Sequence, residues 1–167
     1  MQYLGDVDLT LSRVADKWER MSEIMGDQTQ LSRKLKSELI SNIMETTFCE
    51  ELGVRCRRGN GDHEADIYVD DNPVEIKTSY HSRSWRGGAF SKRDGDYLMV
   101  TWTENEVTKR LEFFAIQVPL LESDWKAGNV GNYYATNIDL DTLLSKNHVI
   151  HVGDVEKKRK NHHPVFL

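Results

Sequence analysis

Residues 65 to 77 constrain the fold of this chain more than any other stretch. Two runs in which apolar and polar residues alternate, 65–69 and 73–77, flank the sequence Asp70-Asp71-Asn72. Alternation with a period of two is typical of β-strands, and Asp and Asn adopt the backbone conformations that tight turns require. We therefore predict a β-hairpin with two antiparallel strands over this segment.

The two faces of the predicted hairpin differ in chemistry, because alternate side chains of a strand share a face. Asp66, Glu75 and Lys77 lie on one face, and Asp66 comes opposite the other two if the strands pair in register. The hairpin is thus expected to bring two carboxylates and one amine together on rigid strands. The apolar side chains of the other face are those of Ile67, Val69, Val74 and Ile76.

Two carboxylates and an amine in one small space suit metal-assisted hydrolysis of a phosphodiester. The carboxylates can hold Mg²⁺, a hard cation that prefers oxygen ligands and keeps several waters. The metal activates a water and neutralises charge on the phosphate, and a nearby lysine stabilises that charge or orients the nucleophile. The alternative interpretation is an exposed hairpin whose outer face carries ordinary solvated charges.

The order Asp, eight residues, Glu, one residue, Lys resembles the motif of the PD-(D/E)xK nuclease superfamily, and the chain is most similar to a small type II restriction endonuclease. The resemblance implies that Asp66 and Glu75 bind Mg²⁺ (or Mn²⁺ in its place) and that Lys77 is catalytic. It also implies an α/β (α+β) fold with a restriction-endonuclease-like core, in which helices flank a mixed central β-sheet. Ala65 stands where the motif often has proline.

Two helices are predicted before the hairpin. Apolar residues at helical intervals indicate one helix over 7–25, ended by Gly26, and another over about 31–52, ended by Gly53. The apolar residues of the first are Leu9, Leu11, Val14, Trp18, Met21 and Met25. The expected buried side of the second carries Leu31, Leu35, Leu39, Ile43, Phe48 and Leu52.

The second helix offers a further acid to the site. Many members of the resembled superfamily add an acid from the helix that precedes the motif strands, and Glu38 and Glu45 are both candidates. We favour Glu45, because it lies nearer the end of the helix that leads into the strands. The alternative for either glutamate is an ordinary solvated helix face.

Residues 78–95 are predicted to form a basic loop that wraps a DNA duplex. Aromatic residues and two adjacent glycines are interleaved with the basic ones, and long loops in compact domains are uncommon without a function. Lysine and arginine contact phosphates, and arginine also reads guanine edges. The alternative is a solvated surface loop. The expected DNA contacts are Arg83, Arg86, Lys92 and Arg93.

The remaining elements are predicted from shorter patterns. A strand is expected over 54–58, a second over 96–102 that is covered on both faces, and a third over 110–118. Pro119 is expected to begin a helical or turn segment. The later expectations are a short strand at 133–134, a helical turn capped by Asp139, a strand over 148–152 and a basic tail over 156–163.

Composition narrows the class of protein. The 167 residues suit one domain, with helices over 7–52, a catalytic sheet over 53–120 and a mixed region with the tail over 121–167. A net charge of −5 does not itself favour a polyanion, although an acidic protein can still carry a basic face. The absence of a signal-peptide pattern and of a long apolar run, together with two unpaired cysteines, predicts a cytoplasmic protein with no membrane partner.

The sequence thus predicts a Mg²⁺-dependent, sequence-specific endonuclease acting on double-stranded DNA. A small subunit has one active site and cuts both strands only by pairing, so a homodimer is expected. A junction resolvase, a repair nuclease or a homing endonuclease would share the fold. The alternatives of other classes are a non-catalytic DNA-binding domain and a protein-interaction domain with a charged hairpin.

Overall fold

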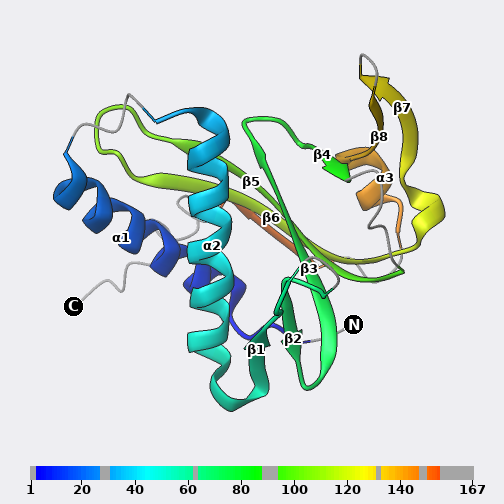
Figure 1. Ribbon diagram of the computed structural model, residues 1–167, viewed down its shortest axis with the longest axis horizontal. Helices are drawn as coiled ribbons and strands as arrows, with labels where there is room; N and C mark the ends of the chain where they lie inside the picture. Colours follow the sequence, from blue (N-terminus) through cyan, green and yellow to red (C-terminus); the bar gives the residue numbers. More distant parts are fainter. Residues whose placement is uncertain are drawn as a thin grey trace, which may run out of the picture.

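The computed structural model describes residues 3–26, 31–61, 64–87, 94–130, 133–146 and 150–154 (Figure 1). Lys92, Arg93, His148 and the tail over 156–163 lie outside these ranges. The helices of the described ranges are α1 (Val7–Met25), α2 (Arg33–Leu52) and α3 (Leu140–Leu144), with 3₁₀ turns at Gly53–Arg55 and Glu122–Asp124. The strands are β1 (Cys56–Arg58), β2 (Ile67–Val69), β3 (Asn72–Tyr80), β4 (Ser84–Gly87), β5 (Gly95–Glu104), β6 (Leu111–Leu120), β7 (Lys126–Val130), β8 (Tyr133–Asp139) and β9 (Ile150–Asp154).

Within the described ranges the strands form two sheets. The larger sheet has the order β1-β2-β3-β5-β6-β9 and is mixed, because β3 and β5 run parallel while its other neighbours are antiparallel. The smaller sheet is antiparallel with the order β4-β8-β7. Figure 1 shows α1 and α2 at one end of the molecule and the smaller sheet with α3 at the other. The predicted fold class, a mixed central sheet with flanking helices, is confirmed.

Alternation along β5 explains how the larger sheet is covered on both faces. Leu98, Val100 and Trp102 are buried in a core shared with α1 and α2. Tyr97 and Met99 point to the opposite face, where they are buried in a second core shared with the smaller sheet and α3. The larger sheet is therefore the middle layer of three, and the prediction that residues 96–102 are covered on both faces is confirmed.

The predicted hairpin is present with the predicted register. Ile67 lies opposite Val74 and Val69 opposite Asn72. Asp70 and Asp71 have φ angles of 49° and 63°, as the two central residues of a type I′ turn require. The four apolar side chains of the hairpin are buried in the core under the helices, namely Ile67, Val69, Val74 and Ile76.

Both helices have the capping that their sequences favour. The Asp6 carboxylate accepts a hydrogen bond from the Leu9 N–H at 3.0 Å, and the Ser32 hydroxyl accepts one from the Leu35 N–H at 3.1 Å. Gly26 and Gly53 follow the last residues with φ angles of 74° and 60°. The predicted ends of both helices are thus confirmed, while α2 begins two residues later than expected because Ser32 is its cap.

The buried side of α2 differs from the prediction. Leu35 has 40% of its surface exposed, and Leu39 and Ile43 are only partly buried against the core. Leu9 and Met25, expected on the apolar side of α1, are exposed as well. The stripe of α2 that faces inward therefore lies beside the predicted one. The buried residues of α2 are Ile40, Met44, Thr47 and Phe48.

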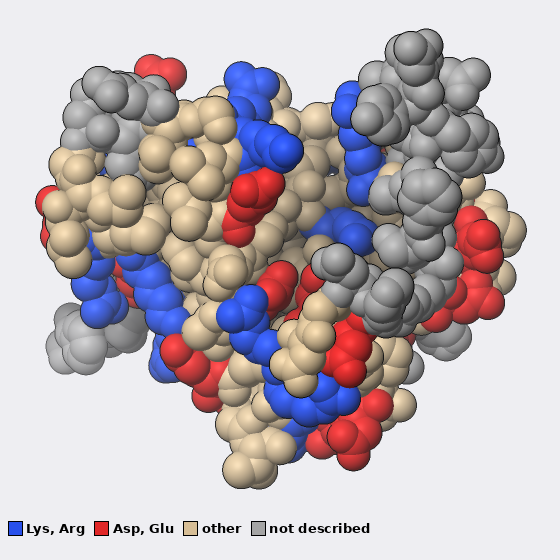
Figure 2. All heavy atoms as spheres, viewed as in Figure 1, with Lys and Arg blue, Asp and Glu red and all other residues tan. Residues whose placement is uncertain are grey.

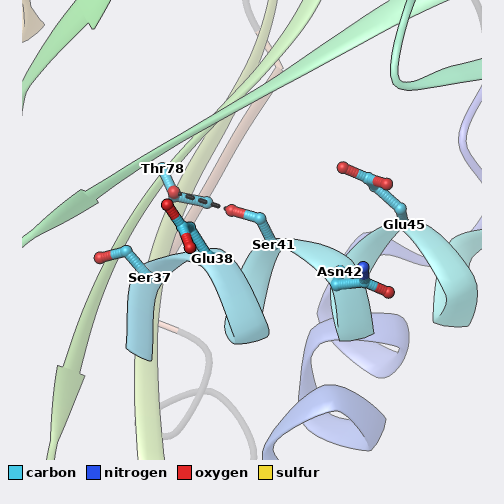
Figure 3. A pocket seen from close by; sticks show the side chains of 6 residues that line it. All are labelled: Ser37, Glu38, Ser41, Asn42, Glu45 and Thr78. Atoms are coloured by element: carbon cyan, nitrogen blue, oxygen red, sulfur yellow. Dashed lines mark hydrogen bonds between the residues drawn. The ribbon is translucent and has the colours of Figure 1, made fainter. Parts of the chain in front are cut away.

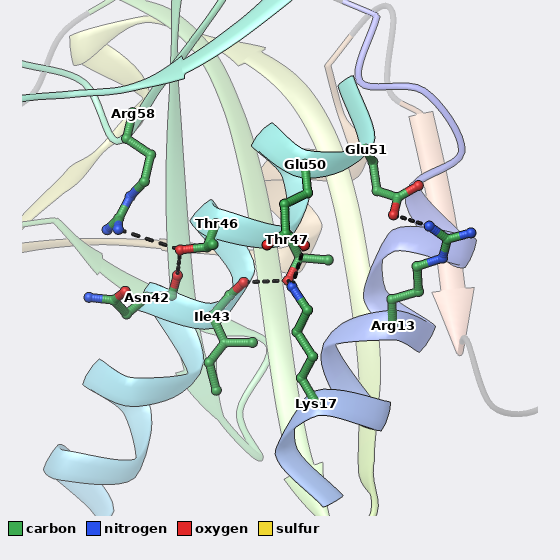
Figure 4. Close-up of polar contacts among 9 residues, drawn as sticks. All are labelled: Arg13, Lys17, Asn42, Ile43, Thr46, Thr47, Glu50, Glu51 and Arg58. Carbon is green, nitrogen blue, oxygen red and sulfur yellow. Dashed lines mark hydrogen bonds and ion pairs between the residues drawn. The ribbon is translucent and has the colours of Figure 1, made fainter. Parts of the chain in front are cut away.

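Polar contacts join α2 to α1 near the C-terminal end of α2 (Figure 4). The Lys17 ammonium donates to the Thr47 hydroxyl at 3.0 Å and pairs with the Glu50 carboxylate at 2.6 Å. Arg13 forms an ion pair with Glu51 one helical turn further along each helix. α2 is therefore held firmly at the end that leads into β1.

The predicted loop over 78–95 is wrong for its first half. β3 continues to Tyr80, and β4 forms a strand in which exposed and buried residues alternate. Trp85, one of the aromatic residues interleaved with the basic ones, is fully buried, and its indole N–H donates to the Val100 carbonyl at 3.0 Å. Because this large side chain is buried against the larger sheet, β4 is packed onto that sheet and does not form a solvated surface loop.

The helical or turn segment expected from Pro119 through Trp125 is present only as the 3₁₀ turn Glu122–Asp124, because β6 continues through Leu120 with Pro119 opposite Asp96. Proline has no N–H to donate to a neighbouring strand, but in the described chain β9 pairs with β6 only from Phe114 to Gln117, so no such bond is missing at Pro119.

The strand expected over 54–58 is a 3₁₀ turn followed by β1, and the expected strand at 133–134 extends to Asp139 as β8. Asp139 caps α3 as predicted. The strand expected over 148–152 is shifted to β9, Ile150–Asp154.

No helix of the described chain is both long and apolar enough to cross a membrane.

Candidate active site

Asp66 and Glu75 meet on the face of the hairpin that points away from the helices. The register places Asp66 opposite Glu75, and a side-chain hydrogen bond joins the two carboxyl groups. The second oxygen of Asp66 accepts the Ile76 N–H at 2.7 Å, which fixes the direction of this side chain. The alternation of polar and apolar residues in the two strands and the length of the turn predicted that these two carboxyl groups lie close together.

Lys77 lies beside Glu75 on the same face, as expected for residues two apart on a strand. Its ammonium is 3.4 Å from a Glu75 carboxylate oxygen. The exposed fractions of the two side chains are 25% for Lys77 and 16% for Glu75, so solvent reaches the pair without surrounding it. The amine therefore remains available to a substrate group that approaches this face.

The pKa of the Glu75 carboxyl is raised above its ordinary value. Burial is the largest cause, and the charge of Asp66 raises the pKa further. Lys77 acts in the opposite direction without cancelling these effects. A carboxylate whose negative charge is disfavoured in this way, beside a second carboxylate, provides a place where a cation is favoured.

This donor set fits a magnesium ion. In the described residues, no three His, Cys, Asp or Glu side chains are grouped to hold a metal. Mg²⁺ needs no such cage, because one or two carboxylates suffice when waters and substrate phosphate oxygens complete its six ligands. Asp66 and Glu75 supply carboxylate oxygens from two paired strands, which suits this mode of binding.

Glu45 of α2 lies within electrostatic range of the hairpin acids. Burial raises the pKa of its carboxyl, the hydrogen bond from Arg58 opposes that rise, and the charge of Asp66 adds to it. Arg58 of β1 pairs with Glu45 at 2.6 Å and also contacts the Thr46 hydroxyl at 3.4 Å (Figure 4). The sequence did not indicate Arg58, because the pair depends on how α2 and β1 lie side by side.

A groove along α2 leads to Glu45 (Figure 3). It has a volume of about 270 Å³, and the Ser41 and Thr78 hydroxyls join its two walls at 3.0 Å. Glu38, the other acid considered, also lines it but is exposed. Of the two, Glu45 is the one coupled to Asp66 and Lys77. The residues that line the groove are Ser37, Glu38, Ser41, Asn42, Glu45 and Thr78.

The surface around the site is hollowed. Figure 2 shows a hollow between α2 and the region of β4, with Lys or Arg atoms inside it and both acidic and further basic atoms around it. Of the basic residues expected to contact DNA, Arg83 and Arg86 are exposed beside and on β4. The Arg83 guanidinium lies over the Phe114 ring, 4.0 Å from its centre, which restricts its motion. Lys92 and Arg93 lie outside the described residues.

Gly59 determines the position of Asp66. The chain after β1 passes so close to the hairpin that a Cβ at Gly59 would lie 1.9 Å from the Ala65 carbonyl oxygen. The Gly59 N–H donates to the Asp66 carbonyl at 3.1 Å. Only glycine permits this approach.

Replacing Gly59 with alanine is therefore expected to destabilise the protein by about 1–3 kcal/mol, since the backbone before Asp66 must move. Urea unfolding followed by circular dichroism measures this change. Gly95→Ala is the matched control, because nothing lies within 4 Å of a Cβ there. Equal stability of the two variants would contradict the role assigned to Gly59.

Comparison with known proteins supports the fold. No protein-family model and no curated protein sequence matches the chain. Among solved structures, the chain is similar to a restriction endonuclease in complex with substrate DNA, with a TM-score of 0.56. The likeness covers 87% of this chain and 83% of that chain at 10% sequence identity. The chain therefore has a restriction-endonuclease-like fold, which is the fold that the resemblance implied.

Proposed function

We propose that the protein is a Mg²⁺-dependent endonuclease that hydrolyses phosphodiester bonds in double-stranded DNA. The observation that carries the proposal is the meeting of Asp66, Glu75 and Lys77 on one face of a hairpin. The restriction-endonuclease-like fold around this group adds support, and the similar structure is bound to DNA. Two carboxylates and an amine at one point of that fold suit phosphodiester hydrolysis better than a solvated surface hairpin does.

The roles follow from the geometry of the side chains. A Mg²⁺ ion held by Asp66 and Glu75 would supply an activated water and neutralise charge on the scissile phosphate. Lys77, on the same face as Glu75, stabilises negative charge on the phosphate or orients the attacking water. Glu45 is the additional acid, and its pair with Arg58 fixes its carboxylate at the end of the groove.

DNA binding is assigned to the basic residues on the β4 side of the hollow. Arg83 and Arg86 contact the duplex, with Lys92 and Arg93 in the same stretch of sequence. A single site of this kind cuts one strand, so cleavage of both strands requires two copies, and we propose a homodimer that acts on a specific sequence. Size-exclusion chromatography with light scattering, with and without DNA, tests this assembly.

Incubation of plasmid and phage DNA with the protein and Mg²⁺ tests the proposed activity. Discrete fragments are expected with Mg²⁺ or Mn²⁺ and none with EDTA, since the carboxylates alone provide no nucleophile. Nicks or a smear would indicate a repair or resolvase activity of the same fold. Failure to cut any duplex or branched DNA with either metal would refute the proposal.

A further inference from the structure

The smaller sheet has an outer face whose side chains form a row across all three strands. Arg86 of β4 lies directly opposite Asn137 of β8, and Lys126 of β7 lies opposite Asn137 on its other side. Directly opposed residues share a face of a sheet. All three residues are exposed, and the Lys126 side chain retains 61% of its surface. We call Arg86, Asn137 and Lys126 the outer row.

The neighbouring row anchors this sheet to the protein. Trp85 and Ile138 oppose each other and are fully buried, and Trp125, which precedes Lys126, is buried in the same core. The strands therefore alternate between a row of large apolar side chains facing inward and the outer row facing solvent. Side chains on such anchored strands are more precisely placed than side chains on a loop.

The smaller sheet stands on the catalytic face of the larger sheet. Tyr97 and Met99 of β5 lie opposite Glu75 and Lys77 of β3 in the parallel register. These two β5 residues are buried in the core under the smaller sheet, together with Trp85. Glu75 and Lys77 are thus one strand, about 5 Å, from residues that the smaller sheet covers. A ligand lying on the catalytic side chains therefore meets the side of this sheet.

The chemistry of the outer row is that of base recognition. Arginine binds the O6 and N7 atoms of guanine with two hydrogen bonds, and asparagine binds N6 and N7 of adenine in the same way. Among described residues, no acid pairs with Arg86. Lys126 pairs with Asp139 at 3.3 Å, but both side chains are exposed, and such surface pairs are weak. Its amine can therefore exchange Asp139 for a phosphate.

The width of the outer row indicates which groove of a DNA duplex it can enter. Neighbouring strands lie about 4.8 Å apart, so Arg86 and Asn137 lie side by side on the two-stranded ribbon of β4 and β8, and Lys126 lies about 10 Å from Arg86 on β7. The major groove of B-DNA is about 12 Å wide, admits a two-stranded β-ribbon and shows a distinct pattern of donors and acceptors for each base pair. Lys126, one strand beyond the ribbon, then lies at the edge of the groove, where the phosphates are. The minor groove, about 6 Å wide, is too narrow for the ribbon and distinguishes the base pairs poorly.

We propose that the outer row reads base edges in the major groove of a DNA duplex, with Arg86 and Asn137 as specificity-determining residues and Lys126 as a phosphate contact. The proposal rests on the proposed function for its choice of duplex DNA as the ligand. It adds Asn137 and Lys126, which carried no assignment, and it narrows the role of Arg86 from a DNA contact to the reading of a base edge.

Selection from a random duplex library, followed by sequencing of the bound DNA, tests the proposal without requiring cleavage. The selection uses the full chain carrying Lys77→Ala, in EDTA, so that bound DNA is not cut. Asn137→Ala is expected to lower discrimination at one base pair by roughly 10- to 100-fold, and Arg86→Ala at a different base pair. Lys126→Ala is expected to keep the selected sequence and to reduce the salt slope of binding by about one unit.

The matched control is Arg20→Ala, which removes an exposed arginine from α1 at the other end of the molecule. It is expected to keep the selected sequence unchanged. Identical selected sequences for the parent, Arg86→Ala and Asn137→Ala proteins would overturn the proposal, even if the wild-type chain cleaves DNA. Specific binding that depends on these residues, in a wild-type protein that cuts nothing, would uphold this inference and refute the nuclease activity.

Discussion

Replacing Lys77 with alanine is expected to lower the rate of DNA cleavage by at least about 100-fold while DNA binding is nearly retained. The Lys77 ammonium is 3.4 Å from Glu75 and only a quarter exposed, so in the proposed reaction it would lie where charge develops on the phosphate. Preorganised groups of this kind act mainly on the transition state, and their loss lowers the rate more than the affinity. Single-turnover cleavage in Mg²⁺ and fluorescence anisotropy in EDTA measure the two quantities.

Lys109→Ala serves as the matched control for Lys77→Ala. Lys109 is an exposed lysine in the turn between β5 and β6, and no described residue forms an ion pair with it. Lys109→Ala should cleave DNA at the wild-type rate. A Lys77→Ala protein that cuts as fast as this control would remove Lys77 from the catalytic group. Loss of binding and cleavage to the same extent would assign Lys77 to binding alone.

Local patterns in the sequence were enough to predict the hairpin that carries the site. The turn at Asp70 and Asp71 fixes the register within a few residues, and the register alone brings Asp66 opposite Glu75. Helix ends were predictable for the same reason, since Gly26 and Gly53 act on the residues directly before them. The proximity of Asp66, Glu75 and Lys77 is therefore encoded almost entirely by local sequence.

Features that depend on distant pairing were not predictable. Arg58 reaches Glu45 only because α2 and β1 lie side by side, and no sequence pattern around either residue predicts this ion pair. Trp85 sits among basic and small residues that suggest a loop, yet a hydrogen bond to Val100 and the core on β5 bury it. Asn137 gains its place beside Arg86 from the pairing of β4 with β8. Tertiary packing overrides local preference at each of these residues.

Replacing Glu75 with glutamine is expected to abolish cleavage and, in metal-free buffer at neutral pH, to raise the melting temperature. Ionised Glu75 is unfavourable in the folded protein, because burial and the Asp66 charge raise its pKa. Glutamine has a similar shape and removes this charge, although it also loses the ion pair with Lys77. Burial and Asp66 outweigh Lys77 in raising the pKa, so the net effect on the free energy of unfolding is favourable.

The sign of the pH dependence follows from the same shift. The folded protein binds the Glu75 proton more tightly than the unfolded chain does, so the stabilisation from this proton is fully present below the ordinary pKa of 4.5. It is lost as the pH rises through the raised value in the folded state. Wild type and Glu75→Gln should therefore have similar melting temperatures below pH 4, and the variant should be the more stable near pH 7.

Addition of Mg²⁺ should reverse the order of the two proteins at neutral pH. A ligand that binds only the folded state at about 100 times its Kd adds about 2.7 kcal/mol to stability. For a chain of this size, that corresponds to about 5–10 °C in melting temperature. Wild type should gain this amount and Glu75→Gln little of it, because the variant lacks one of the two carboxylates that are proposed to hold the ion. Thermal melts of both proteins with Mg²⁺ and with EDTA measure the difference, and equal gains for the two would exclude Glu75 as a metal ligand.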